Sequence, residues 1–149
     1  FGGFLNTRAA AFDKRFKVMV ADPGNLAWGG QIKQRLQMIL QIPEGQRPPF
    51  MNFMLDDYAW KQGVPKEDVP ADLDRYDNTD VVELVTCETL VLDGAAEVQP
   101  GAAKQYFDAL RCPKEYHLFG FDSTAQCHCQ TGGYAPASEF IMNWLEEKL

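Results

Sequence analysis

The chain has 149 residues, of which 46% are hydrophobic and 23% are charged, and this composition is typical of one globular domain. Its 14 basic and 21 acidic residues give a formal net charge of −7, and the basic residues are scattered rather than gathered in a stripe. Nucleic-acid surfaces need clustered cations, and a membrane-spanning helix needs about 20 consecutive apolar residues. The sequence therefore predicts no nucleic-acid partner and no membrane partner, and we take the cytoplasm as the default location.

The first 45 residues predict a helix, a strand and a second helix. The segment TRAAAFDKRF (7–16) favours a helix because alanine has the highest helix propensity. The valine-rich run FKVMVAD (16–22) precedes a Pro-Gly turn and is typical of a short buried strand. An amphipathic helix follows, with apolar residues at helical spacing: Ile32, Leu36, Ile39 and Leu40.

The sequence of residues 24–80 indicates an insertion between two parts of the core. From residue 43 onward this segment is rich in proline and acidic residues, so we expect short helices with irregular connections. Its apolar residues form a patch at helical spacing that has to pack against something: Phe50, Met51, Phe53, Met54, Tyr58 and Trp60.

The last third alternates between strands and helices. Residues 89–94 and 115–121 are typical of strands, whereas 100–112 and 135–149 are typical of helices. This alternation predicts an α/β fold with a mostly parallel sheet flanked by helices. Three strands are few for such a sheet, and the strand near 16–21 would lie at an exposed edge. We therefore expect the chain to be part of a larger fold.

The cysteines do not predict a metal site. Cys127, His128 and Cys129 are adjacent, but a zinc site needs pairs of ligands at a wider spacing. Because the chain is large enough to form a core without disulfides, we expect free thiols at Cys87 and Cys112 as well. No motif for a cofactor is present.

Several short motifs together resemble one family. They are GGF (2–4), TRAAAFDKR (7–15), LVLDGAAE (90–97), DSTAQCHCQ (122–130) and NWLEEKL (143–149). With these motifs the chain resembles the C-terminal part of an α/β-hydrolase. The resemblance is to the group that contains the fungal yellowish-green-type polyketide-shortening hydrolases and 2,6-dihydroxypseudooxynicotine hydrolase. It implies that residues 1–23 and 81–149 belong to the hydrolase core and that 24–80 form a helical cap.

The resemblance also implies the residues of a catalytic triad in the order serine, acid, histidine. The nucleophilic serine would directly precede Phe1, whose backbone N–H would then contribute to the oxyanion hole. His128 would be the general base, because it lies in a loop before the last helix, whereas His117 lies within a strand and is expected to be structural. Glu97 would be the acid, although the family usually has aspartate there, and Asp93 remains the alternative.

The resemblance implies a small-molecule substrate and leaves its identity open. Hydrolysis of an ester, or of a C–C bond in a polyketide-like β-diketone, would place the protein in secondary metabolism such as pigment biosynthesis. Cap residues would form an apolar pocket, or else merely pack: Trp28, Phe50, Phe53, Met54, Tyr58 and Trp60. The isolated segment would be inactive and would need the N-terminal half of the fold. Other interpretations stay open. The chain could be a non-catalytic hydrolase-like module or one chain of a two-chain enzyme, and it could form a homodimer.

Overall fold

The chain forms two compact units in the computed structural model, which describes residues 1–149. The first unit comprises Phe1–Leu26 and Asn78–Leu149, and the second comprises Ala27–Asp77. Where the chain leaves and re-enters the first unit, the amide of Asn78 donates a hydrogen bond to the carbonyl of Leu26 at 2.9 Å. The side-chain amide of Asn25 donates to Gln99 at 2.7 Å, so the segment before the boundary is bound to the first unit.

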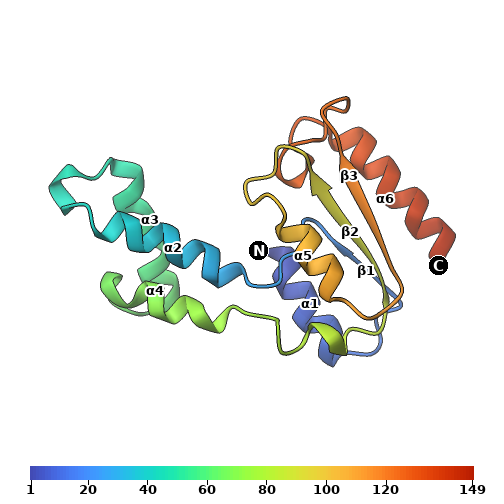
Figure 1. Cartoon of the computed structure of the whole chain (residues 1–149), viewed down its shortest axis with the longest axis horizontal. Coiled ribbons are helices and arrows are strands. Elements are labelled where there is room, and N and C mark those ends of the chain that lie inside the picture. Colours follow the sequence, from blue (N-terminus) through green and yellow to red (C-terminus); the bar gives the residue numbers. More distant parts are fainter. The chain divides into compact units, whose positions relative to one another are not determined.

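A sheet of three parallel strands organises the first unit (Figure 1). The strands are β1 (Val18–Ala21), β2 (Glu88–Gly94) and β3 (Lys114–Phe119), in the order β1-β2-β3. Val20 is paired with Leu90, and Val91 is paired with Tyr116. The predicted number and direction of strands are confirmed, and β1 lies at an edge of the sheet. The central strand β2 is buried on both faces, which explains its continuous apolar run.

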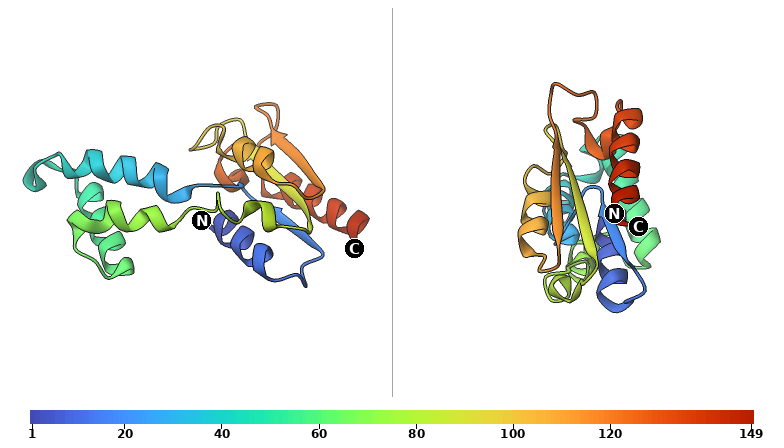
Figure 2. Two further views of the ribbon diagram at one scale, coloured as in Figure 1. Left: turned by 60° about the horizontal axis from the view of Figure 1, so that its bottom comes forward. Right: turned by 90° about the vertical axis from the view of Figure 1, so that its right-hand side faces the viewer.

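Helices cover both faces of this sheet. On one face, α1 (Gly2–Phe12) and α5 (Ala102–Ala109) form a core with β2, in which Ala10 and Tyr106 pack near Val91. On the other face, Trp144 of α6 (Tyr134–Lys148) packs with Leu90 and Leu92. Figure 2 shows α5 and α6 on opposite sides of the sheet. The predicted apolar face of α6 is confirmed, because its residues all join this second core: Phe140, Ile141, Trp144 and Leu145.

Helix α1 differs from its predicted position. It begins at Gly2 and ends at Phe12, whereas the sequence predicted a helix over 7–16. A Cβ atom at Gly3 would lie 2.0 Å from the carbonyl oxygen of Pro23, so a close backbone approach requires glycine here despite its low helix propensity. The helix ends because Asp13 is extended, with φ −103°, and its side chain accepts a hydrogen bond from the amide of Arg15.

The second unit is helical and has a core of its own. It contains α2 (Trp28–Leu40), α3 (Pro49–Gln62) and α4 (Val69–Asp72). Helix α3 is longer than the short helices predicted for this segment. Proline occupies its first position, and Gly63, with φ 69°, caps its C-terminal end. Five fully or almost fully buried residues form the centre of this core: Leu36, Ile39, Leu55, Val69 and Leu73. No helix of the chain is both long and apolar enough to cross a membrane.

Candidate active site

Three loops that follow the three strands meet at one edge of the sheet. Asp22 follows β1, Glu97 follows β2, and His128 lies in the loop between β3 and α6. Because parallel strands end at the same edge, residues that are distant in the sequence converge there. A backbone hydrogen bond from Ala96 to the carbonyl of Gln126, at 2.9 Å, joins the second and third loops.

His128 and Glu97 form a hydrogen-bonded pair. The Nδ1 atom of His128 lies 2.7 Å from Oε1 of Glu97. The Glu97 side chain is only 3% exposed, whereas the imidazole is 48% exposed. The same Oε1 atom accepts a hydrogen bond from the amide of Val98 at 2.6 Å, which fixes the carboxylate from its own loop. The pair therefore consists of a buried, immobilised acid and a ring that reaches the surface.

The acid determines which ring nitrogen of His128 carries the proton. A carboxylate only accepts hydrogen bonds, so Nδ1–H of His128 donates to Glu97. The lone pair then lies on Nε2, which is the arrangement that a general base needs.

Asp93 is placed differently from Glu97, although both belong to the segment LVLDGAAE (90–97). Its Oδ2 atom accepts a hydrogen bond from the hydroxyl of Tyr116 at 2.7 Å, and its Oδ1 atom accepts one from the amide of Gly94 at 2.8 Å. Both oxygens are thus engaged within the sheet, and Asp93 is buried. Burial, followed by the hydrogen bond to Asp93, raises the pKa of Tyr116.

The turn that carries His128 has an unusual backbone. Cys129 and Gln130 have φ values of 49° and 50°, in the left-handed region that non-glycine residues rarely adopt. Two hydrogen bonds close the turn: the amide of Gln130 donates to the carbonyl of Cys127 at 2.8 Å, and the hydroxyl of Thr131 donates to the carbonyl of His128 at 2.9 Å. The side chain of Gln130 is buried, so the turn is anchored in the protein.

The beginning of α1 lies near this turn. The carbonyl of Phe1 accepts hydrogen bonds from the amides of Phe4 and Leu5, which form the first turn of the helix. A Cβ atom at Gly3 would lie 2.0 Å from the carbonyl oxygen of Pro23, and the neighbouring Asp22 accepts a hydrogen bond from the Cys129 thiol through its own carbonyl. The start of α1 and the His128 turn therefore both contact the loop after β1.

Asp22 belongs to this cluster although the sequence analysis assigned it no role. Its backbone carbonyl accepts a hydrogen bond from the thiol of Cys129, with a distance of 3.8 Å between sulfur and oxygen. Burial raises the pKa of Asp22, whereas a side-chain hydrogen bond with Gln130 and the charge of His128 lower it. Its place at the carboxyl end of a parallel strand was the signal in the sequence.

The other histidine, His117, packs within the first unit. Its ring stacks on Phe140 with 3.9 Å between the ring centroids and meets the edge of Phe119. Burial lowers the pKa of His117. These contacts give the ring a packing role on β3.

The six residues expected to line a pocket fall into two sets in the helical unit. Trp28, Met54 and Tyr58 pack against the buried core of that unit. Phe50, Phe53 and Trp60 are exposed on α3, and Trp60 is 80% exposed. The second set leaves most of its apolar surface outside the core of its own unit, whereas the first set is partly buried.

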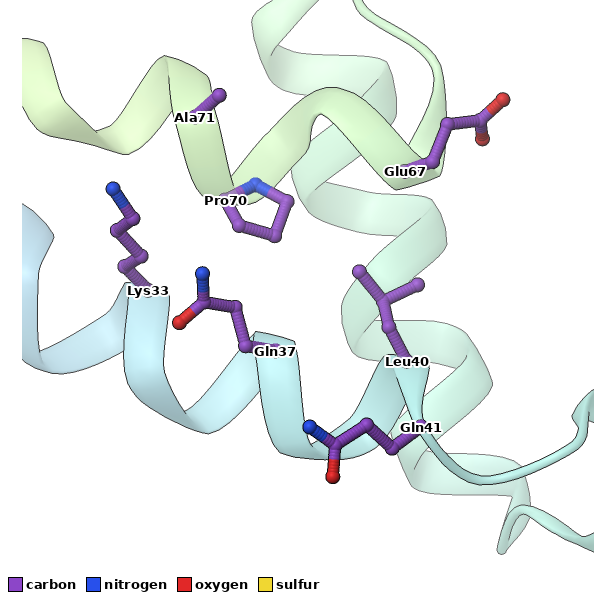
Figure 3. Close-up of a pocket in the computed structure, with 7 residues that line it drawn as sticks. All are labelled: Lys33, Gln37, Leu40, Gln41, Glu67, Pro70 and Ala71. Carbon is purple, nitrogen blue, oxygen red and sulfur yellow. The ribbon is translucent and has the colours of Figure 1, made fainter.

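A cavity of about 580 Å³ lies in the helical unit, and none of the predicted site residues lines it. Figure 3 shows that it is bordered by α2 on one side and by the segment around α4 on the other. Its lining residues are Lys33, Gln37, Leu40, Gln41, Glu67, Pro70 and Ala71. The ammonium group of Lys33 is already paired with Asp74 at 2.6 Å, so the cavity offers no unpaired lysine.

The structure contains no group of three or more histidine, cysteine, aspartate or glutamate side chains arranged to hold a metal ion. All four cysteines are free, with Cys87 and Cys112 buried and Cys129 exposed.

Comparison with solved structures gives 31 matching chains. The chain is similar to 2,6-dihydroxy-pseudo-oxynicotine hydrolase, with 18% identity, a TM-score of 0.68, and coverage of 99% of this chain and 37% of that one. It is also similar to the alpha/beta hydrolase GrgF from Penicillium sp. sh18, with 16% identity, a TM-score of 0.66, and coverage of 98% and 60%. A third similar structure is an acetyl xylan esterase from Paenibacillus sp. R4, with 19% identity, a TM-score of 0.55, and coverage of 99% and 43%.

These matches are structural only. No protein-family model and no curated protein sequence matches the chain. The chain spans between 37% and 60% of the length of the three structures described. The resemblance and the fold class predicted from the sequence are confirmed at the level of the fold.

Proposed function

We propose that this chain, which has the fold of part of an α/β-hydrolase, carries the histidine and the acid of a serine hydrolase. The observation that carries the proposal is the hydrogen bond of 2.7 Å between His128 and Glu97 at the carboxyl edge of the sheet. A buried carboxylate behind a half-exposed imidazole is the arrangement that activates a serine hydroxyl. Asp93 is not assigned this role, because Tyr116 and Gly94 already occupy its two oxygens.

The motif at the start of α1 suggests where the nucleophile lies. In the proposed arrangement the serine directly precedes Phe1 in the longer protein, at a turn that leads into α1. The backbone N–H of Phe1 then donates to the oxyanion that forms when the serine attacks a carbonyl, and one such donor accelerates a reaction about 10² to 10³-fold. The close approach of Gly3 to Pro23, next to Asp22 whose carbonyl accepts a hydrogen bond from Cys129, supports this placement.

Each proton has a place in the proposed reaction. Nε2 of His128 accepts the proton of the serine hydroxyl as the oxygen attacks the carbonyl carbon, and Glu97 stabilises the imidazolium. The imidazolium then gives the proton to the leaving group as the bond to the carbonyl carbon breaks. Water, activated by the same Nε2 atom, hydrolyses the acyl-enzyme and regenerates the serine.

The proposed substrate is an ester or a polyketide-like β-diketone that is cleaved at a C–C bond. Both offer a carbonyl carbon for attack and a leaving group that accepts a proton. Two of the similar structures are named a 2,6-dihydroxy-pseudo-oxynicotine hydrolase and an acetyl xylan esterase, and the second name refers to ester hydrolysis. The exposed aromatic residues Phe50, Phe53 and Trp60 are the proposed apolar contacts of the substrate.

The remaining part of the hydrolase fold is the proposed partner of the sheet. β1 has a neighbouring strand on one side only, which is β2. Since α1 leads into β1, a strand that precedes Phe1 would complete a right-handed strand–helix–strand unit at this edge. The residues upstream of Phe1 therefore have two proposed tasks, to carry the serine and to extend the sheet.

Labelling with a fluorophosphonate tests the proposal in the protein that includes its native sequence upstream of Phe1. We expect one labelled peptide, with the modified serine directly before Phe1-Gly2-Gly3. His128→Ala should lose the label, whereas the control His117→Gln should keep it. A folded protein without a label, or with the label on another serine, contradicts the proposed function and favours a non-catalytic module. Comparing p-nitrophenyl esters with β-diketones then identifies the bond that is cleaved.

A further inference from the structure

We propose that Asn78 is a positioning residue for the first turn of α1, because its buried side-chain amide binds the backbone of that turn. This inference rests on the proposed function for its consequence in catalysis, since this turn would present the oxyanion donor. Its structural content, the hold of Asn78 on Phe4, stands separately.

The side chain of Asn78 binds α1 through both ends of its amide. Its Nδ2 atom donates a hydrogen bond to the carbonyl of Phe4 at 2.8 Å, and its Oδ1 atom accepts one from the guanidinium of Arg8 at 3.4 Å. A carbonyl only accepts and a guanidinium only donates, so the two partners determine how the amide is oriented. Aspartate, which has the same size, would lack the donor for Phe4.

The backbone of Asn78 gives this amide a fixed base. Its N–H donates to the carbonyl of Leu26 at 2.9 Å, and its carbonyl accepts hydrogen bonds from the amides of Val81 and Val82 at 3.0 and 2.8 Å. The residue is completely buried, so water does not compete for the bond to Phe4. Asn78 therefore holds α1 from a segment that is itself held in place.

The contact reaches Phe1 through a single residue. The carbonyl of Phe4 binds Asn78, whereas the amide of Phe4 donates to the carbonyl of Phe1 at 3.0 Å. The same turn also lies against the loop after β1, because a Cβ atom at Gly3 would be 2.0 Å from the carbonyl oxygen of Pro23. The first turn of α1 is thus confined by two separate segments, and the backbone of Phe1 is confined with it.

Formation of the helix does not itself require this donor. In an α-helix each carbonyl accepts the amide four positions later, so α1 provides a partner for the carbonyl of Phe4 without Asn78. The Asn78 amide is an additional donor, and burying it is unfavourable unless all of its groups are paired. Placement of the first turn explains such a donor better than formation of the helix does.

Three substitutions test which end of the amide matters. Asn78→Asp removes the donor and keeps an acceptor for Arg8, whereas Asn78→Ala removes both. In the full-length protein we expect each to lower kcat about 10 to 100-fold, the cost of a small misplacement of a catalytic group, with KM changed by less than about threefold. The midpoint of the pH dependence of kcat/KM should not move, because His128 and Glu97 are unaltered. Arg8→Met leaves Nδ2 bound to Phe4 and should keep kcat within about threefold.

Tyr116→Phe is the control for a mere loss of stability. It removes one buried hydrogen bond elsewhere in the same unit and should destabilise the fold without lowering kcat. An Asn78→Ala variant with the same kcat as Tyr116→Phe would overturn the proposal. An Arg8→Met variant as slow as Asn78→Asp would overturn it as well, because the amide would then act through Arg8.

Hydrogen exchange distinguishes failure of this inference from failure of the proposed function. In the unaltered protein we expect slow exchange of the Nδ2 protons of Asn78, and Asn78→Ala should accelerate exchange of the Phe4 amide more than Tyr116→Phe does. Fast exchange at Nδ2 refutes the positioning role even where a variant does not fold, and so does an unchanged Phe4 amide in Asn78→Ala. Absence of the fluorophosphonate label in the unaltered protein refutes the proposed function and leaves the exchange result intact.

Discussion

His128 and Glu97 are 31 positions apart in the sequence, and their side chains meet at 2.7 Å between Nδ1 and Oε1. The meeting depends on the crossover through α5 from β2 to the parallel strand β3, which returns the chain to the same edge of the sheet. It also depends on the bridge between Ala96 and Cys127, which holds the two loops together next to the pair. The pair is therefore a product of the fold and not of either loop alone.

Replacing Glu97 tests the acid of this pair. Glu97→Gln removes the charge that stabilises the imidazolium and allows the amide to donate to the ring, which favours the wrong tautomer of His128. We expect kcat/KM to fall about 10² to 10⁴-fold. Ester hydrolysis by the full-length protein measures this loss, and circular dichroism verifies that the variant is folded. Glu97→Asp, which keeps the charge on a shorter side chain, should lose less. Equal activity of Glu97→Gln and the unaltered protein would exclude Glu97 as the acid.

Asp93 and Tyr116 should contribute to stability rather than to catalysis. Tyr116→Phe leaves Oδ2 of Asp93 buried without its donor, and such a loss costs about 1 to 3 kcal/mol in the free energy of unfolding. Urea unfolding measures the change, and kcat/KM should stay within about threefold of that of the unaltered protein. A double-mutant cycle with Asp93→Asn isolates the interaction between the two side chains. A loss of activity as large as that of Glu97→Gln would instead assign Asp93 to the site.

The sequence predicted what depends on local pattern and missed what depends on contacts between distant loops. The apolar run of β2 and the apolar face of α6 follow from periodicity, and both predictions are confirmed. The choice between Asp93 and Glu97 stayed open because both lie near the end of the same strand. The observation that favours Glu97 in the proposed site, the hydrogen bond from Tyr116 on β3 to Asp93, depends on the pairing of two strands.

Other features could not be predicted from the sequence because they too depend on contacts between distant segments. The start of α1 at Gly2 could not be predicted from helix propensity, because glycine is unfavourable in helices and is required here by the approach of Pro23. Asp22 stood at the end of a predicted strand, but the contact of its carbonyl with Cys129 comes from a loop more than 100 positions away. The exposure of Phe53 beside the buried Leu55 likewise depends on how α3 packs within its unit.

Substitutions in α3 should separate the core of the helical unit from its surface. Leu55 is fully buried, and Leu55→Ala should lower the free energy of unfolding by about 2 to 5 kcal/mol, as truncation in a packed core does. Phe53 is exposed two positions earlier, so Phe53→Ala should change stability by no more than about 0.5 kcal/mol. Chemical denaturation measures both. If Phe53 contacts the substrate as proposed, Phe53→Ala should also raise KM for apolar substrates, whereas an unchanged KM would remove Phe53 from the proposed pocket.

Lys148 near the end of α6 should stabilise the fold in a way that depends on pH and salt. Its ammonium group lies 2.6 Å from Glu88 and 2.9 Å from Glu115, one on β2 and one on β3. These hydrogen bonds raise the pKa of Lys148, and the hydrogen bond from Lys148 lowers the pKa of Glu115 from its ordinary value of 4.5.

The direction of each pKa change sets the pH range of this stabilisation. A carboxyl group with a lowered pKa contributes stability above its ordinary value, and the contribution is lost as the pH falls from 4.5 through the lower value in the folded protein. A lysine with a raised pKa contributes below its ordinary value of 10.5, and the contribution is lost as the pH rises further. Lys148→Met should therefore lower Tm near pH 7 by a few degrees at most, because the groups are close to the surface. The difference from the unaltered protein should shrink in 1 M salt and toward pH 3. A difference in Tm that persists under both conditions would mean that the Lys148 side chain stabilises α6 through its packing on Trp144 instead of through its charge.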